Sequence, residues 1–155
     1  MDRSEITHIL ERCELFKGLP QSDIDKIAGL CQVETYEAGE YVARQGDFGE
    51  HLYFIAEGQV VLERLTDLGT RKGSVPIGLL GKGRAFGCWS TLLDEPHSLM
   101  SSAVCRKPTK VLAIKGPALR QMLLNNMAMG FNVLERLCFL LRDRIQHAYG
   151  AMEKI

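Results

Sequence analysis

The spacing of hydrophobic residues changes twice along this chain and divides it into three regions. In the first thirty or so residues apolar side chains recur every three or four positions, as in Ile6, Ile9 and Leu10. That spacing predicts helices. Ser22 has the side chain expected of an N-cap, and a second apolar stripe follows it. We therefore expect helices within residues 1–32.

From Val33 onward the pattern alternates in short runs that turn residues separate. Gly39, Gly46 and Gly58 lie where tight reversals commonly need a positive φ, and the polar stretch 66–73 is expected to form a loop. Short strands of this kind are typical of a sandwich or barrel. The predicted strands span residues 33–36, 41–45, 51–56, 59–64, 74–80, 101–105 and 111–114.

Helical spacing returns after Gly116-Pro117, where proline suits a first turn. A short helix is predicted at 118–123 and a longer one at 131–152. One apolar stripe follows the long helix for about five turns, and it can pack on the strands or on a partner. Its members are Leu134, Leu137, Leu141, Ile145, Ala148 and Met152.

Length and composition limit the class of protein. The 155 residues fit one domain, 1–155, with no repeat or linker, and 46% hydrophobic with 25% charged residues is ordinary for a soluble globular chain. Nineteen basic residues balance nineteen acidic ones, which argues against nucleic acid or an anionic membrane as partner. No apolar run suits a membrane span, and the five scattered cysteines predict reduced thiols in a cytoplasmic protein without a metal site.

The strand region resembles the cyclic nucleotide-binding domain family, which includes catabolite activator-type regulators, kinase regulatory subunits and gated channels. The motifs are Tyr-Glu-Ala-Gly-Glu-Tyr-Val at 36–42, Arg-Gln-Gly-Asp at 44–47 and Leu-Tyr-Phe-Ile at 52–55. The resemblance implies a mainly β fold with flanking α: a double-stranded β-helix, or jelly-roll barrel, over 33–115. N-terminal helices would precede the barrel, and helices at 116–155 would follow it.

In this family a short helix between two strands holds the ligand, in a cassette similar to Phe-Gly-Glu followed by Pro-Arg-Ser. Backbone N–H groups cradle the cyclic phosphate, the arginine neutralises it, and the glutamate accepts from the ribose. Here the cassette spans residues 86–99. The candidate ligand-binding residues are Phe86, Gly87, Cys88, Trp89, Ser90, Pro96, His97, Ser98 and Leu99.

Two chemical anchors of the cassette are changed. Cys88 stands where the glutamate is expected, and His97 where the arginine is expected. A thiol is a weak hydrogen-bond partner, and losing a charge-assisted contact to a buried phosphate costs roughly 2–5 kcal/mol. We therefore expect weak or absent binding of cAMP and cGMP. For Trp89, packing of the short helix on the core is favoured over stacking on a base.

Three functions are compatible with these residues. The first is a sensor module for a cyclic nucleotide or another small ligand. The second is a pseudo-binding domain kept for dimerisation or partner docking, and the third is a redox or haem sensor that uses Cys88 and His97. The resemblance also implies a homodimer through the long C-terminal helix. No helix-turn-helix domain is expected.

An enzyme is not expected. The glycine-rich stretch 78–87 lacks the helix and acidic partner of a dinucleotide fingerprint, and Gly83 follows Lys82 where a Walker loop needs Ser or Thr. No Gly-x-Ser-x-Gly or His-Glu-x-x-His motif occurs.

Overall fold

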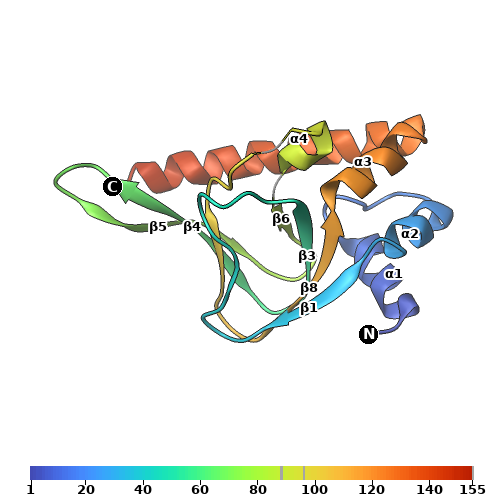
Figure 1. The fold of residues 1–155 in the computed structure, drawn as a ribbon, viewed down its shortest axis with the longest axis horizontal. Coiled ribbons are helices and arrows are strands. Elements are labelled where there is room, and N and C mark those ends of the chain that lie inside the picture. Colours follow the sequence, from blue (N-terminus) through green and yellow to red (C-terminus); the bar gives the residue numbers. More distant parts are fainter. Residues whose placement is uncertain (88, 96, 155) are drawn as a thin grey trace.

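Eight strands form two antiparallel sheets in the computed structural model, which describes residues 1–87, 89–95 and 97–154 (Figure 1). The strand order is β1-β8-β3-β6 in one sheet and β2-β7-β4-β5 in the other. The strands are β1 (Gln32–Tyr36), β2 (Tyr41–Ala43), β3 (His51–Glu57), β4 (Val60–Asp67), β5 (Lys72–Leu80), β6 (Ala85–Gly87), β7 (Ser102–Cys105) and β8 (Thr109–Lys115).

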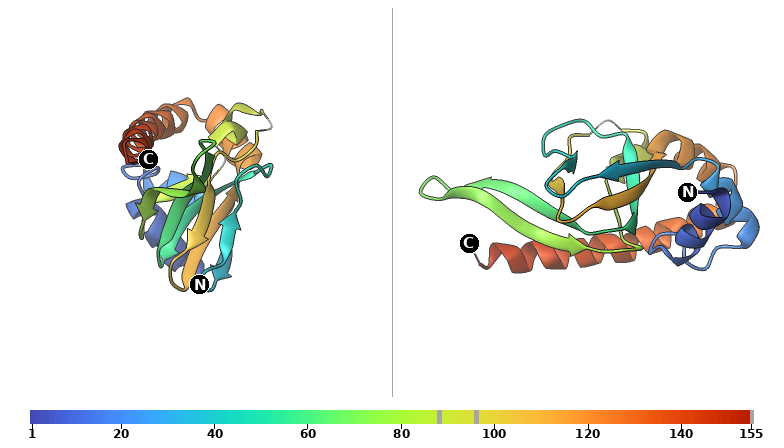
Figure 2. Two further views of the ribbon diagram at one scale, coloured as in Figure 1. Left: turned by 90° about the vertical axis from the view of Figure 1, so that its left-hand side faces the viewer. Right: turned by 90° about the horizontal axis from the view of Figure 1, so that it is seen from below.

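Helices flank the strands at both ends of the chain, as Figure 2 shows. The predicted mainly β fold with flanking α is therefore confirmed, as two four-stranded sheets that no ladder among the described residues closes into a barrel. The helices are α1 (Arg3–Arg12), α2 (Gln21–Ala28), the 3-10 helix η1 (Trp89–Leu93), α3 (Gly116–Leu124) and α4 (Met127–Met152).

Two separate apolar clusters hold these layers together. The first lies between the sheets and takes Ile55 and Val111 from one sheet, and Val60 and Leu80 from the other. The second packs the helices against β3 and β8. Its members come from both ends of the chain and include Leu10, Phe16, Phe54, Leu112, Val133 and Leu140.

The strand reversal at Gly58 needs a residue without a side chain. Its φ is +103°, and a Cβ there would lie 2.4 Å from Thr109 Oγ1 and 2.6 Å from Thr109 Cα. Gly39 and Gly46 have φ of +88° and +90°, so the positive φ predicted for all three glycines is confirmed. At Gly58 the constraint is steric as well as conformational.

We expect Gly58→Ala to lower the free energy of unfolding by about 2 kcal/mol, because the new methyl group collides with backbone that the β8 ladder holds in place. Gly46→Ala is the matched control. It has the same strained φ but no atom within 4 Å of the Cβ, and we expect a cost of about 1 kcal/mol. Urea titration of both variants measures the difference, and equal losses would contradict the steric argument.

Two local predictions were wrong. The loop predicted at 66–73 is confined to residues 68–71, because β4 and β5 pair out to Asp67 and Lys72, whose side chains form a 3.1 Å ion pair. Backbone ladders need no apolar side chains, so a polar hairpin was mistaken for a loop. Helix α2 begins two residues earlier than expected, with Pro20 and not Ser22 as its N-cap. The carbonyl of Pro20 accepts from the N–H groups of Asp23 and Ile24.

No helix in the described ranges combines the length and apolar character that crossing a bilayer requires.

Candidate functional site

The cassette begins on β6, which pairs with β3 through Phe86↔Tyr53 and Gly87↔Leu52. Phe86 is buried between the sheets, with its ring centroid 5.2 Å from that of Tyr53. Phe86 is thus an anchor of the cassette in the sheet core. Cys88 and Pro96 lie outside the described residues, as does the side chain of Ser90.

Gly87 allows β6 to pass directly against β3. Its φ is +127°, and a Cβ would lie 2.5 Å from the carbonyl oxygen of His51 and 3.1 Å from Leu52 Cα. Any side chain here would push the cassette away from the sheet. The glycine at the cassette entrance therefore has a packing role that does not depend on a bound ligand.

Helix η1 follows and packs the cassette against the helical cluster. Leu92 is 5% exposed within the helical cluster, and Trp89 packs against the same cluster, as predicted. From α3, Arg120 donates to the carbonyl of Leu92. The short helix between two strands that the resemblance implied is therefore present, and it contacts the helical cluster and the helix α3.

The chain then returns along the turn between β2 and β3. Gly46 donates to the carbonyl of Leu99 at 2.9 Å, and Leu99 donates to Asp47 at 2.8 Å. Ser98 forms an isolated bridge with Phe48. His97 is exposed just before this pairing. Backbone pairing thus fixes residues 98–99, and His97 directly precedes them.

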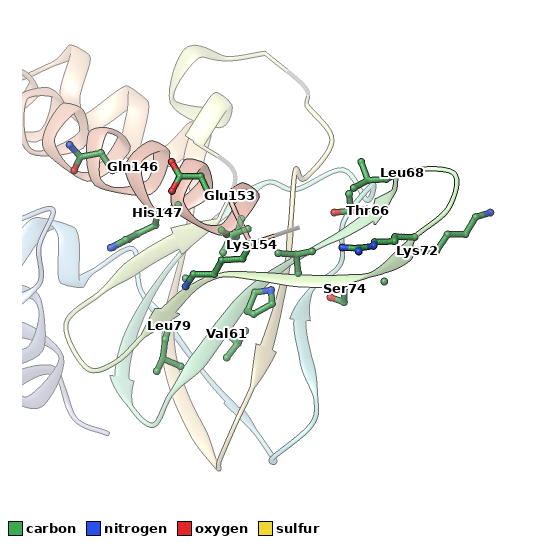
Figure 3. A pocket seen from close by; sticks show the side chains of 18 of the residues that line it. Val61, Thr66, Leu68, Lys72, Ser74, Leu79, Gln146, His147, Glu153 and Lys154 are labelled. Carbon is green, nitrogen blue, oxygen red and sulfur yellow. The ribbon is translucent and has the colours of Figure 1, made fainter.

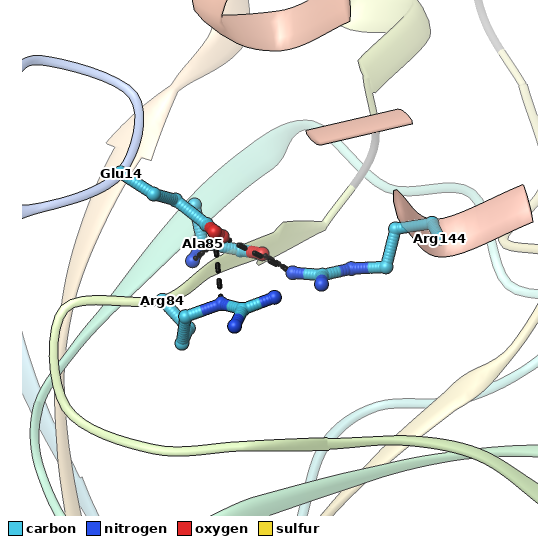
Figure 4. Close-up of polar contacts among 4 residues, drawn as sticks. All are labelled: Glu14, Arg84, Ala85 and Arg144. Atoms are coloured by element: carbon cyan, nitrogen blue, oxygen red, sulfur yellow. Dashed lines mark hydrogen bonds and ion pairs between the residues drawn. The ribbon is translucent and has the colours of Figure 1, made fainter. Parts of the chain in front are cut away.

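A charged cluster that the sequence did not predict connects the start of β6 to α4 (Figure 4). Glu14 lies 2.8 Å from Arg84 Nε and 3.2 Å from Arg144 Nη2, and it accepts from the N–H of Ala85 at 2.7 Å. Arg144 also donates to the carbonyl of Ala85 at 2.6 Å. These residues are far apart in sequence, so no local pattern could have revealed the cluster.

The Glu14 carboxylate compensates an arginine that is largely removed from water. Arg144 is only 14% exposed, and its Nη1 has no hydrogen-bond partner within residues 1–87, 89–95 and 97–154. Burial lowers the pKa of Arg144, and the neighbouring Glu14 opposes that shift. The cluster therefore depends on Glu14 to keep a buried guanidinium stable beside the cassette entrance.

The thiols differ sharply in accessibility. Burial raises the pKa of Cys13 to about 12, and burial together with Cys13 raises that of Cys31 to about 12. Cys138 is exposed on α4. Within the described ranges no three His, Cys, Asp or Glu side chains gather as a metal site would require.

We expect iodoacetamide at pH 8, added to the native protein diluted until it is monomeric, to modify Cys138 and to leave Cys13 and Cys31 unmodified, because the thiolate is the reacting form and only Cys138 is exposed in the single chain. Peptide mass spectrometry after a short exposure measures each site. Denaturation in urea before labelling is the control, and it should expose all three thiols equally. Native labelling of Cys13 as fast as Cys138 would contradict the buried placement.

One side of α4 exposes apolar residues that the packed chain leaves uncovered. Phe131 is 70% exposed, Leu134 49%, Ile145 52% and Met152 63%. Leu141 and Ala148 are partly buried. Leu137 is only 8% exposed and belongs to the helical cluster, so it does not lie on this side. The sequence stripe mixed a core side and an exposed side, because both repeat every three or four residues.

Adding Met127 and Cys138 gives these exposed positions a regular spacing. They recur at alternating intervals of four and three residues, which is the heptad spacing of a coiled coil. We call this set the α4 seam: Met127, Phe131, Leu134, Cys138, Leu141, Ile145, Ala148 and Met152.

Comparison with known sequences identifies relatives of several kinds. The family described as "Cyclic nucleotide-binding domain" matches residues 33–126. The cyclic AMP receptor protein of Thermus thermophilus is 39% identical over 100 residues, which are 64% of this chain and 44% of that protein. Mouse cGMP-dependent protein kinase 2 is 31% identical over 94 residues, 61% of this chain and 12% of the kinase. The chain thus spans less than half of these relatives.

Solved structures agree in fold. A cyclic nucleotide-binding domain from Methylobacillus flagellatus superposes with a TM-score of 0.79 at 25% identity, covering 99% of this chain and 84% of that one. The Thermus thermophilus catabolite activator protein superposes with a TM-score of 0.68 at 34% identity, covering 90% and 62%.

Proposed function

Because this chain is a regulatory module of the cyclic nucleotide-binding domain family, we propose that it senses a small ligand through the cassette at 86–99 and binds cAMP and cGMP only weakly. The observation that carries the proposal is an intact cassette frame with altered anchors. Gly87, η1 and the backbone pairing of Leu99 keep the frame. Cys88 and His97 occupy the positions of the family's glutamate and arginine.

The type of side chain at position 97 supports the weak-binding part of the proposal. A phosphate is held most strongly by a guanidinium that offers two parallel donors, and an imidazole cannot offer that geometry. Ligand binding at this cassette must therefore rest mainly on backbone N–H groups. A ligand with less negative charge than a cyclic phosphate would lose less from the change.

Calorimetric titration of the native chain with cAMP and with cGMP at pH 7.5 tests this directly. We expect no saturation below about 100 μM, since the lost contacts are each worth roughly 2–5 kcal/mol. The cyclic AMP receptor protein of Thermus thermophilus serves as the positive control. A submicromolar dissociation constant for either nucleotide would refute weak binding.

We further propose that the α4 seam pairs two copies of the chain in parallel as a homodimer. The eight seam positions follow heptad spacing, and six of them are exposed, so α4 has an apolar surface that water solvates poorly. The same seam supports the second candidate function, a pseudo-binding domain that acts through dimerisation. A redox or haem sensor at Cys88 and His97 remains a hypothesis from the sequence.

In a parallel pair each seam residue faces its own counterpart, so the two Cys138 thiols would meet. We expect copper-phenanthroline oxidation to give a disulfide-linked dimer on a non-reducing gel. Cys138→Ser should abolish it, and Cys31→Ser, which changes a thiol in the helical cluster, should not. A native protein that stays monomeric by light scattering and yields no cross-link would refute the parallel homodimer.

A further inference from the structure

A groove of about 850 Å³ lies between β5 and the last turns of α4, apart from the cassette (Figure 3). One wall is the run of residues 71–79, which includes most of β5. The other wall is formed by the end of α4 from Gln146 and by the two residues that follow the helix, Glu153 and Lys154. Val61 of β4 lies between the walls. None of the cassette residues that the structure describes lines this groove.

The β5 wall is an edge strand. In the described part of the chain β5 pairs only with β4, so alternate backbone N–H and C=O groups on its other side have no strand partner. Such an edge can hydrogen-bond to an extended peptide. Pro76 lacks an N–H and offers only its carbonyl, which limits how long a strand could pair here.

The groove combines apolar surface with a basic rim. Leu68 and Leu79 are 54% and 60% exposed and leave apolar surface open to solvent. The lining cations outnumber the lining carboxylate Glu153 by four to one, and Asp67 pairs with one of them. The cations are Arg71, Lys72, Arg106 and Lys154.

Gly150 has no side chain and so leaves the groove wide where α4 lines it. A Cβ at this position would meet no atom within 4 Å, so nothing in the fold requires a glycine there. Glycine inside a helix costs about 1 kcal/mol relative to alanine. The residue thus weakens α4 slightly and leaves space at the middle of the groove wall.

The groove would stay open in the proposed homodimer. At about 100° per residue, Gly150 and Lys154 lie roughly 160° around α4 from the middle of the α4 seam. A partner helix on the seam would therefore leave this wall uncovered. The two surfaces can act at the same time, and neither depends on nucleotide binding.

We propose that this groove binds an extended acidic segment of a partner protein. The edge backbone fits an extended chain, the rim fits carboxylates, and the exposed leucines fit an apolar side chain between them. A small amphiphile fits less well, because small-ligand sites enclose most of the ligand surface and this groove is open along Leu68 and Leu79.

The test uses a fluorescein-labelled peptide, Glu-Val-Glu-Leu-Glu-Val-Glu, and the intact chain at 50 mM salt, followed by fluorescence anisotropy. We expect saturable binding that weakens as salt rises. Gly150→Leu should weaken it at least about tenfold by filling the groove. Gly150→Ala is the matched control: it adds a single methyl group, strengthens the helix and should bind within about threefold of the native chain.

Three results would overturn the proposal. They are no saturable binding by the acidic peptide, equal binding when lysine replaces its glutamates, and unchanged binding by Gly150→Leu. If laurate bound the native chain and the peptide did not, the groove would be a site for a small amphiphile, and the proposal would be wrong. Cyclic-nucleotide titration of Gly150→Leu should match that of the native chain, so a failure at the cassette is distinguished from a failure at the groove.

Discussion

Cys88→Glu combined with His97→Arg is expected to raise the affinity of this chain for cAMP by about 30- to several-thousand-fold. The gain comes from restoring two charge-assisted contacts on a frame that Gly87, η1 and Leu99 already hold. A guanidinium would bind the phosphate in a bidentate fork, and a carboxylate would accept from the ribose hydroxyl. Calorimetry at pH 7.5 on native and double-variant chains measures the change.

The single variants and a distant control make this result interpretable. His97→Arg alone should recover most of the gain, because the phosphate carries the ligand's charge. His8→Arg makes the same chemical change on the exposed side of α1 and should leave cAMP binding as it is in the native chain. A double variant that folds normally and still binds no cAMP at millimolar concentration would show that the frame itself no longer fits the nucleotide.

Glu14→Ala is expected to lower the free energy of unfolding by about 3 kcal/mol. Among the described residues, Glu14 is the only one whose carboxylate forms an ion pair with Arg144, and the Arg144 side chain is 14% exposed. Removing one partner of a buried ion pair leaves an uncompensated charge, which costs more than the pair itself contributes. The substitution also removes the carboxylate oxygen that accepts a hydrogen bond from the N–H of Ala85, beside the cassette entrance. Urea unfolding followed by far-UV circular dichroism measures the loss.

Arg142→Ala is the matched control for that experiment. Arg142 pairs with Asp143 on α4 at 3.3 Å, but its side chain is 60% exposed. Exposed pairs contribute about 0–1 kcal/mol, so we expect a change within about 0.5 kcal/mol. If Glu14→Ala lowered the free energy of unfolding no more than Arg142→Ala does, the cluster would not contribute to stability beyond an ordinary surface ion pair.

The features of the fold that the sequence predicted are those encoded locally. Glycines at tight reversals, alternation in β3 and helical spacing after Pro117 each depend on a few neighbouring residues. The hairpin at 66–73 was missed because its pairing uses backbone bonds between polar residues, which leave no hydrophobic pattern. Alternation identifies strands that bury one face, and this hairpin extends away from the core.

The candidate site was predictable only in part, for a similar reason. The cassette could be recognised because its residues are contiguous along the chain. The Glu14 cluster joins Arg84 and Arg144 over long separations, and only the three-dimensional structure brings them together. The two sides of α4 could not be separated from periodicity, since Leu137 and Leu134 fit one helical stripe equally well.

The helical cluster has a consequence for synthesis on the ribosome. Leu10 and Phe16 lie near the start of the chain, whereas Val133 and Leu140 come from α4. The cluster between the sheets needs nothing beyond β8. During translation the sheets can therefore close while α1 and α2 still present bare apolar surface, until α4 emerges and covers it. A chaperone that binds exposed apolar segments would find its binding surface on α1 and α2, and would be released when α4 packs there.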